Sequence, residues 1–300
     1  DGGGSIRIPA SCCGLVGLKP SRGRIPFGPD KAEGWAGLSS SHVVSRSVRD
    51  TAAMLNATAG PEPGEAYSAP SYSGTFLEAV RSTPGSLKIA VSREKWGSGS
   101  YQPEVLAGLD RTVTLLEGLG HKVEEARPVF DGEAVAATMG TIVAVNTALL
   151  ISQRAAELCC EVNELDMETA TRSYLEMGRA VSATDYVEAI QTIQGLGRLL
   201  GRFHQRYDVL LAPTLSSQPV PVGYICEAPP EEYMARFLDF IGDTAVYNQT
   251  GQPSISLPLH WSEDNLPVGM MFTAAYGNDA LLLQLAGQLE QCVPWWDRRP

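Results

Sequence analysis

The chain has 300 residues, of which 44% are hydrophobic and 19% are charged, and this balance predicts a globular protein and excludes a disordered one. Its formal net charge of −11 argues against direct contact with nucleic acid, because an acidic surface repels phosphate. No apolar run reaches the length that spans a bilayer and no secretory signal is visible, so we expect a cytoplasmic protein without a membrane partner.

The chain opens with the stretch Asp1-Gly2-Gly3-Gly4-Ser5. Successive glycines free the backbone to point several N–H groups at one spot, which makes a nest for negative charge. Ser5 adds a hydroxyl at the edge of this nest, and donors beside a nucleophile are what acyl transfer requires. From these residues alone, an anion-binding loop and a flexible linker remain equally open. Pro9 limits how far a helix can extend back through Ser5.

Strands and helices alternate through the next part of the chain. The apolar pattern predicts strands at 15–18, 41–45, 87–91 and from 121. Helices are expected from the N-cap Ser47 to Gly60, over 75–81, and from Pro103 to Gly120. Residues 25–40 form a loop in which Trp35 serves as a packing anchor. This alternation predicts an α/β fold.

From 132 to about 204 the apolar spacing is mostly helical. Within the apolar segment 140–151, Thr141 and Asn146 either make hydrogen bonds inside the helix or face a cavity, and we favour the first. We interpret the region as a largely helical insertion at about 130–205. No repeat or linker divides the chain, so we expect a single domain over residues 1–300.

The last third predicts further strands. Residues 207–214 are apolar and end in Pro213-Thr214, which suits a central strand covered on both faces. Residues 231–247 are expected to be helical and 248–253 to form a turn. Strands at 254–258 and 268–272 follow, and Asn278-Asp279 is expected to cap a last helix.

The cysteines have no spacing typical of a metal site or a disulfide framework. They are Cys12, Cys13, Cys159, Cys160, Cys226 and Cys292. The sequence therefore predicts reduced, mostly buried thiols, with no metal and no cofactor.

A histidine could serve Ser5 as a base, but no histidine lies in a recognisable catalytic motif. The candidates are His42, His121, His204 and His260. His42 lies in a predicted strand, where a structural role is more common than catalysis. The residues by themselves therefore predict an oxyanion loop with an adjacent hydroxyl and do not identify a catalytic base.

A family resemblance extends this interpretation. Residues 1–11, then Cys13-Gly14 and Gly17-Leu18-Lys19-Pro20, resemble the second half of the motif that names the amidase signature family. Further resemblances lie at 45–50, 207–214, 250–254 and 266–269. The resemblance implies an α/β/α sandwich around a mixed β-sheet, with the N-terminal part missing.

The resemblance also implies roles for individual residues. Ser5 matches the acylated nucleophile, and the backbone N–H groups of Gly2, Gly3, Gly4 and Ser5 match the oxyanion hole. Asp1 and Arg7 match polar residues that brace the loop. The family's Lys base and its cis-Ser lie upstream of this stretch, and Lys19 matches a family lysine that is not the base. We therefore expect a C-terminal portion of a longer enzyme that is inactive by itself.

Three functions fit these features. The first is an amidohydrolase that cleaves a small-molecule carboxamide through an acyl-enzyme on Ser5. Stretches around 35–42 and 60–70 resemble amidases that act on cyclic dimers of 6-aminohexanoate, which implies such a dimer as one candidate substrate. The second is an amidotransferase subunit that releases ammonia from glutamine beside a partner chain. The third is a non-catalytic anion-binding module. Homodimer formation stays open.

Overall fold

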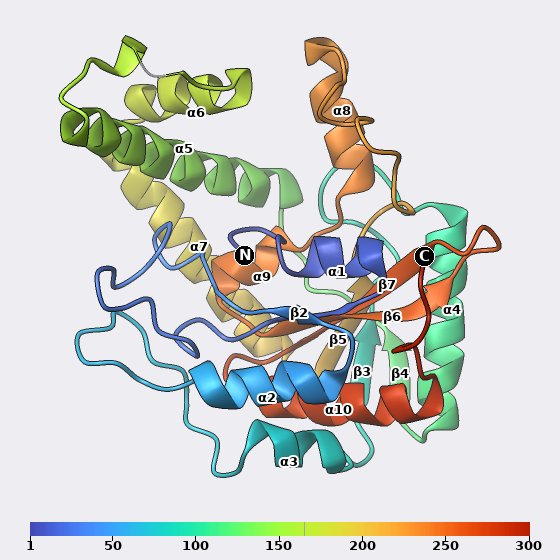
Figure 1. Cartoon of the computed structure of the whole chain (residues 1–300). Coiled ribbons are helices and arrows are strands. Elements are labelled where there is room, and N and C mark those ends of the chain that lie inside the picture. Colours follow the sequence, from blue (N-terminus) through green and yellow to red (C-terminus); the bar gives the residue numbers. More distant parts are fainter. Residues whose placement is uncertain (165) are drawn as a thin grey trace.

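A seven-stranded sheet with strand order β2-β1-β6-β7-β5-β3-β4 forms the centre of the molecule (Figure 1). The computed structural model describes residues 1–164 and 166–300. The strands are β1 Val16–Lys19, β2 Val44–Ser45, β3 Lys88–Val91, β4 Lys122–Glu125, β5 Val209–Pro213, β6 Ser254–Trp261 and β7 Pro267–Ala274. β3 pairs in parallel with β4 and β5, whereas the other neighbouring pairs are antiparallel. The sheet is therefore mixed, as expected.

Helices cover both faces of this sheet. They are α1 Arg7–Cys13, α2 Val48–Thr58, α3 Phe76–Arg81, α4 Pro103–Gly118, α5 Gly132–Glu157, α6 Thr169–Ala180, α7 Ala183–Phe203, α8 Pro230–Phe240, α9 Ala245–Thr250 and α10 Asp279–Cys292. Figure 1 shows α2, α3 and α10 on one side of the sheet and α1 and α9 on the other. The expected α/β/α architecture is confirmed.

The main core lies between the sheet and the layer of α2, α3 and α10. Every residue of β5 and β7 is buried, which confirms 207–214 as a central strand. Leu55, Leu282 and Leu289 pack against this apolar surface with Ile89 and Phe272 of the strands. The opposite face of the sheet is also covered: α1 and α9 lie on it, and Leu200 and Tyr247 pack there against Leu210.

The helix ends follow local chemistry that the sequence predicts. The Ser47 hydroxyl accepts from the N–H of Asp50, and Pro103 occupies the first position of α4. Thr141 and Asn146 donate to carbonyls one turn earlier in α5, so the first of the two interpretations is confirmed for both. Helix α1 was not expected. Pro9 fits its first turn because that N–H has no intrahelical partner.

Two predictions near the C-terminus are wrong. A single helix over 231–247 followed by a turn is replaced by α8, a break at 241–244, and α9, which includes Asn248. The break occurs because Ile241 pairs with Leu215 in an isolated β-bridge. Asn278 precedes α10 without a side-chain cap bond. The neighbouring Asp279 is wholly buried instead and forms an ion pair with Arg24 at 2.8 Å.

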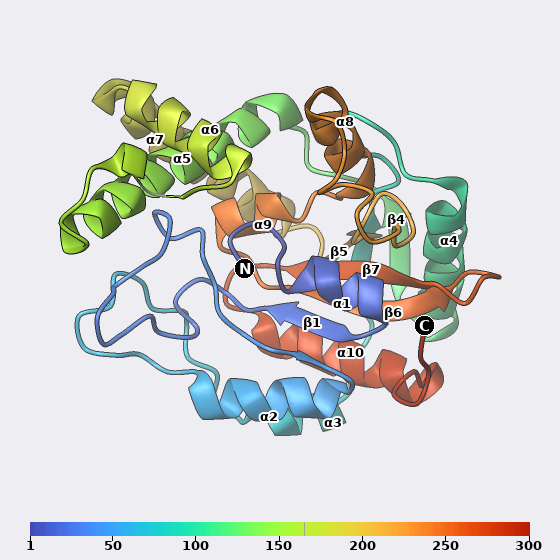
Figure 2. The same cartoon turned by 45° about the horizontal axis from the view of Figure 1, so that its top comes forward.

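The helices α5 and α6 and the first part of α7 extend away from the sheet as a largely helical arm (Figure 2), and α7 then runs back to the sheet, where Leu196 and Leu200 pack near Leu210. Contrary to our expectation, α5 is long and apolar enough to cross a membrane by length and composition, with 33% of its most apolar window buried. Core helices of soluble proteins meet the same criterion. Ile142, Ala148 and Ile151 of α5 pack on neighbouring residues of this arm and of the loop that contains Leu38.

The cysteines are free, but the prediction that most are buried is wrong. Cys13, Cys159, Cys226 and Cys292 are exposed, and Cys12 and Cys160 are partly exposed. Most of them lie at or just beyond the ends of helices, where the chain turns toward the surface.

Candidate active site

The Ser5 loop, defined as residues Asp1 to Ser5, leads directly into α1. Ser5 is exposed. The backbone N–H groups of Gly2, Gly3, Gly4 and Ser5 donate to no group in the described part of the chain. A run of unpaired N–H donors beside an accessible hydroxyl can stabilise an oxyanion that develops on a substrate carbonyl.

Packing explains why the loop contains glycine at two of its positions. A Cβ on Gly4 would lie 2.5 Å from Ile8 Cδ1 and from Thr244 Oγ1, and the φ of Gly4 is +150°. A Cβ on Gly2 would lie 2.6 Å from the ring of Trp35. Side chains at these positions would strain or displace the loop. Trp35 is thus the packing anchor that the sequence predicts, and it packs directly on the Ser5 loop.

Asp1 and Arg7 form a buried ion pair beneath this loop. Arg7 Nη2 lies 3.0 Å from Asp1 Oδ1, and both side chains are wholly inaccessible to solvent. Asp1 Oδ2 also accepts from the N–H of Ile6 at 3.0 Å. Burial lowers the pKa of Arg7 to about 9, so the guanidinium remains charged at neutral pH. The pair joins the first residue of the loop to the first turn of α1.

Thr244 and Asn248 complete this arrangement, and sequence reasoning missed both. Thr244 Oγ1 donates to the carbonyl of Gly3 at 2.5 Å, and the Thr244 carbonyl accepts from Arg7 at 2.8 Å. Asn248 Nδ2 donates to Asp1 Oδ1 at 2.9 Å, while Asn248 Oδ1 accepts from Arg7 at 2.5 Å. The only signal was that Asn248 lies two residues before the motif at 250–254 and follows the run Ala245-Val246-Tyr247.

Lys19 is the buried lysine nearest in sequence to this loop. Its Nζ donates to the carbonyl of Pro20 at 2.7 Å. Burial holds its pKa well below the usual value for lysine. The hydroxyl of Ser5 has no hydrogen bond to Lys19 or to any other described residue.

The histidines have other partners or none. The ring nitrogens of His42 are buried without a hydrogen bond inside the described structure, and burial lowers its pKa to about 4. His121 accepts from the N–H of Leu87, and His260 contacts Glu104. None of the four histidines bonds to Ser5. Among the residues that the structure describes, which do not include Leu165, no cluster of three or more His, Cys, Asp or Glu side chains could hold a metal ion.

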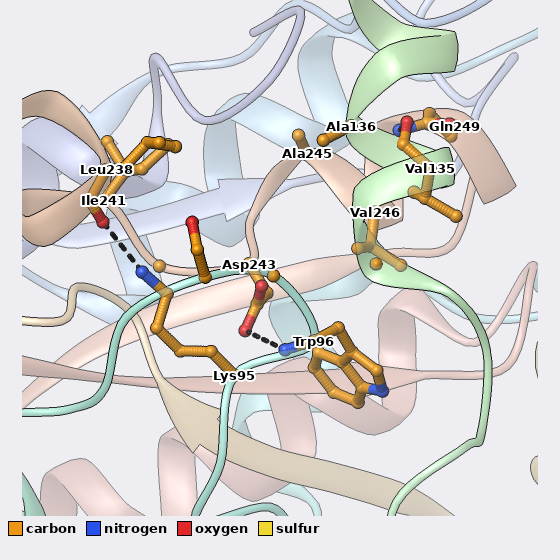
Figure 3. Close-up of a pocket in the computed structure, with 14 residues that line it drawn as sticks. Lys95, Trp96, Val135, Ala136, Leu238, Ile241, Asp243, Ala245, Val246 and Gln249 are labelled. Carbon is orange, nitrogen blue, oxygen red and sulfur yellow. Dashed lines mark hydrogen bonds between the residues drawn. The ribbon is translucent and has the colours of Figure 1, made fainter. Parts of the chain in front are cut away.

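A cavity of about 100 Å³ lies next to the Ser5 loop, between α5, α9 and the end of α8 (Figure 3). Most of its side chains are apolar, including Trp96, Val135, Leu238 and Ile241. Ala245 lines the cavity and also lies against the Ser5 loop, since a Cβ added to Gly3 would lie 3.7 Å from Ala245 Cβ.

Asp243 and Lys95 supply the charges of this cavity. Asp243 accepts from the N–H of Trp96 and from the hydroxyl of Tyr101 at 3.2 Å, and burial raises its pKa. Lys95 Nζ donates to the carbonyl of Leu238 at 2.8 Å (Figure 3), and burial lowers its pKa. The cavity is therefore a narrow, mainly apolar site with one acidic and one basic group.

Similarity to known proteins extends over most of the chain. A family model described as amidase matches residues 1–283. The chain belongs to the amidase family. It is 33% identical over 312 residues to the 6-aminohexanoate-cyclic-dimer hydrolase of Paenarthrobacter ureafaciens, and equally identical to the enzyme of that name from Pseudomonas sp. strain NK87. Each alignment covers 100% of this chain and 63% of the relative, so the chain spans less than two thirds of their length.

Solved structures share this fold. The structure of a 6-aminohexanoate cyclic dimer hydrolase complexed with substrate superposes with a TM-score of 0.90 at 32% identity, covering 100% of this chain and 65% of that one. This match confirms the amidase-signature-type fold for the chain.

Proposed function

We propose that the protein is an amide hydrolase in which Ser5 is the nucleophile. The observation that carries the proposal is an exposed Ser5 beside four unpaired backbone N–H groups, in a chain of the amidase family. Ser5 Oγ attacks the carboxamide carbon, and the oxyanion accepts hydrogen bonds from those groups. The C–N bond then breaks and the amine leaves with a proton. Water cleaves the resulting ester, which releases a carboxylic acid and restores Ser5.

The buried contacts below the loop support this chemistry. Stabilisation of an oxyanion depends on donors that are held in place before the reaction. The ion pair between Asp1 and Arg7, together with Thr244 and Asn248, holds the Ser5 loop from two distant parts of the chain. We infer that these four residues position the loop and that they do not touch the reacting atoms.

The proton of Ser5 needs an acceptor. The family resemblance assigns it to a lysine that acts through a second serine, and no residue of this chain matches either role. The chain also spans less than two thirds of its relatives. We infer that hydrolysis through Ser5 needs such a pair in addition to the residues of this chain, and that the 300-residue chain is inactive by itself.

The names of two relatives support a proposal for the substrate class. Two relatives named as hydrolases of the 6-aminohexanoate cyclic dimer align with the whole chain. The cavity beside the Ser5 loop is lined mainly by apolar side chains, which is compatible with the methylene chains of such an amide. We propose a small aliphatic carboxamide, with this cyclic dimer as the first compound to test.

The test compares Ser5→Ala with Ser41→Ala, which also removes an exposed hydroxyl. Hydrolysis is measured by mass spectrometry on the natural gene product that contains this chain, with the cyclic dimer, an aryl amide and glutamine as substrates. We expect Ser5→Ala to lower kcat/KM by at least ~10³-fold, whereas Ser41→Ala retains activity. Unchanged turnover in Ser5→Ala contradicts the proposal. Release of ammonia from glutamine alone, together with a copurifying second subunit, would instead support an amidotransferase.

A further inference from the structure

A second cavity, of about 190 Å³, lies between α4, the end of β6 and the segment after α10. Its polar and aromatic side chains come from Arg111, His260, Trp261, Trp295 and Arg298. No lining side chain carries a negative charge. In a chain with a formal net charge of −11, a cavity that gathers two guanidinium groups is a local exception.

Neither guanidinium is neutralised by a carboxylate. Arg111 contacts the ring of His260, with Nη1 3.3 Å from Nδ1. Arg298 donates to the amide oxygen of Asn265 at 3.2 Å, and its Cζ lies 4.4 Å from the centroid of the Trp261 ring. Neither arginine forms an ion pair with any residue that the structure describes. Both retain N–H donors for a further acceptor, because a guanidinium has five.

The contacts of His260 determine its tautomer. A guanidinium can only donate, so Nδ1 must be the acceptor from Arg111. Nε2 then carries the hydrogen and donates to Glu104 Oε1 at 2.6 Å. Gly108 lets the ring approach α4, since a Cβ there would lie 2.7 Å from His260 Cδ2. Glu104 is thus engaged by His260 Nε2, while the nitrogen on the other side of the ring contacts Arg111.

The indole N–H of Trp295 adds an unused donor. Trp295 is 2% exposed, and its Nε1 has no acceptor within the described structure. A buried donor without a partner is unfavourable. We propose that this cavity binds a small oxyanion, a carboxylate or a phosphate, through Arg111 and Arg298, with the rings of Trp261 and Trp295 as its apolar walls.

This oxyanion site is separate from the Ser5 loop. Trp261 packs against Gly14, which follows the last residue of α1, whereas Ser5 precedes the first residue of that helix. The site therefore lies at the opposite end of α1. Its test measures binding to the chain and does not depend on hydrolysis at Ser5.

The test is calorimetric titration of the 300-residue chain with inorganic phosphate and with glutarate, at constant ionic strength adjusted with chloride. We expect saturable binding of at least one of the two, and we expect Arg111→Gln and Arg298→Gln each to weaken it by about tenfold or more. Arg299→Gln is the matched control, because Arg299 is adjacent but does not line the cavity. The affinity of the Arg299→Gln variant for the anion should stay within about twofold of the affinity of the unsubstituted chain.

The outcomes are distinct. Tighter binding of phosphate assigns the site to a phosphate-bearing ligand, and tighter binding of glutarate assigns it to a carboxylate. Arg298→Lys retains the charge and should restore part of the affinity lost in Arg298→Gln. Thermal unfolding of each variant verifies its fold. Absence of saturable binding for both anions, or equal weakening by Arg299→Gln, would overturn the proposal.

Discussion

Arg7 Nη2 lies 3.0 Å from Asp1 Oδ1, and both side chains are completely buried below the loop that presents Ser5. A buried ion pair is strongly unfavourable when one partner is removed, because the other charge remains without compensation. Here both charges also bond to Asn248, so the pair connects the start of the chain with α9. This relationship makes the loop sensitive to changes far from it in sequence.

Arg7→Met should destabilise the chain by about 3–5 kcal/mol, because the carboxylate of Asp1 stays buried without its cation. Arg49→Met is the matched control. Arg49 pairs with Asp50 on the surface, where the two side chains are 70% and 54% exposed. That change should cost less than about 1 kcal/mol. Urea unfolding measures the free energy of unfolding of both variants. An equal loss of stability in the two would show that the buried ion pair is not the stronger contact.

Gly4→Ala should destabilise the chain by about 1–3 kcal/mol, since the added Cβ meets Ile8 and Thr244 at a positive φ. Gly140→Ala is the control, because a Cβ at that position of α5 meets nothing within 4 Å. That change should stabilise the helix by up to about 1 kcal/mol. Chemical unfolding measures the free energy of unfolding of both variants, and equal values for Gly4→Ala and Gly140→Ala would contradict the prediction. In the natural gene product, Gly4→Ala should also lower kcat/KM for amide hydrolysis.

His42 should make the fold sensitive to mild acid. Its pKa is lowered from 6.5 to about 4 by burial, so the unfolded chain takes up a proton at a higher pH than the folded chain. Stability is therefore lost as the pH falls from about 6.5 to 4, by at most about 3 kcal/mol. Urea unfolding at a series of pH values should show a weaker acid dependence in His42→Asn. An identical dependence in both proteins would contradict this assignment.

The thiols should react at different rates. Cys13, Cys159, Cys226 and Cys292 are exposed and should alkylate first with iodoacetamide. Cys12 should react last, because burial raises the pKa of its thiol to about 11. Peptide mass spectrometry at successive times measures the order. Rapid modification of Cys12 would mean that its surroundings at the end of α1 are more open than the structure shows.

Much of the fold could be predicted because local chemistry decides it. Ser47 and Pro103 start helices through bonds or backbone geometry within a few residues, and the continuous apolar run at 207–214 requires a strand covered on both faces. The break between α8 and α9 was missed because a contact with Leu215, more than 20 residues away, decides it. The cap expected at Asn278 fails for a similar reason, since Asp279 pairs with Arg24 instead.

By itself, the sequence determined that the chain has a mixed α/β fold of the amidase type and that Ser5 follows a glycine-rich loop. The spacing of apolar residues and the motif at 1–20 carry that information locally. Only the tertiary structure decided which residues hold the loop. Thr244 and Asn248 reach Gly3, Asp1 and Arg7 across more than 230 residues, and burial at that junction makes those contacts strong. A partner so distant in sequence is selected by packing, and no local pattern identifies it.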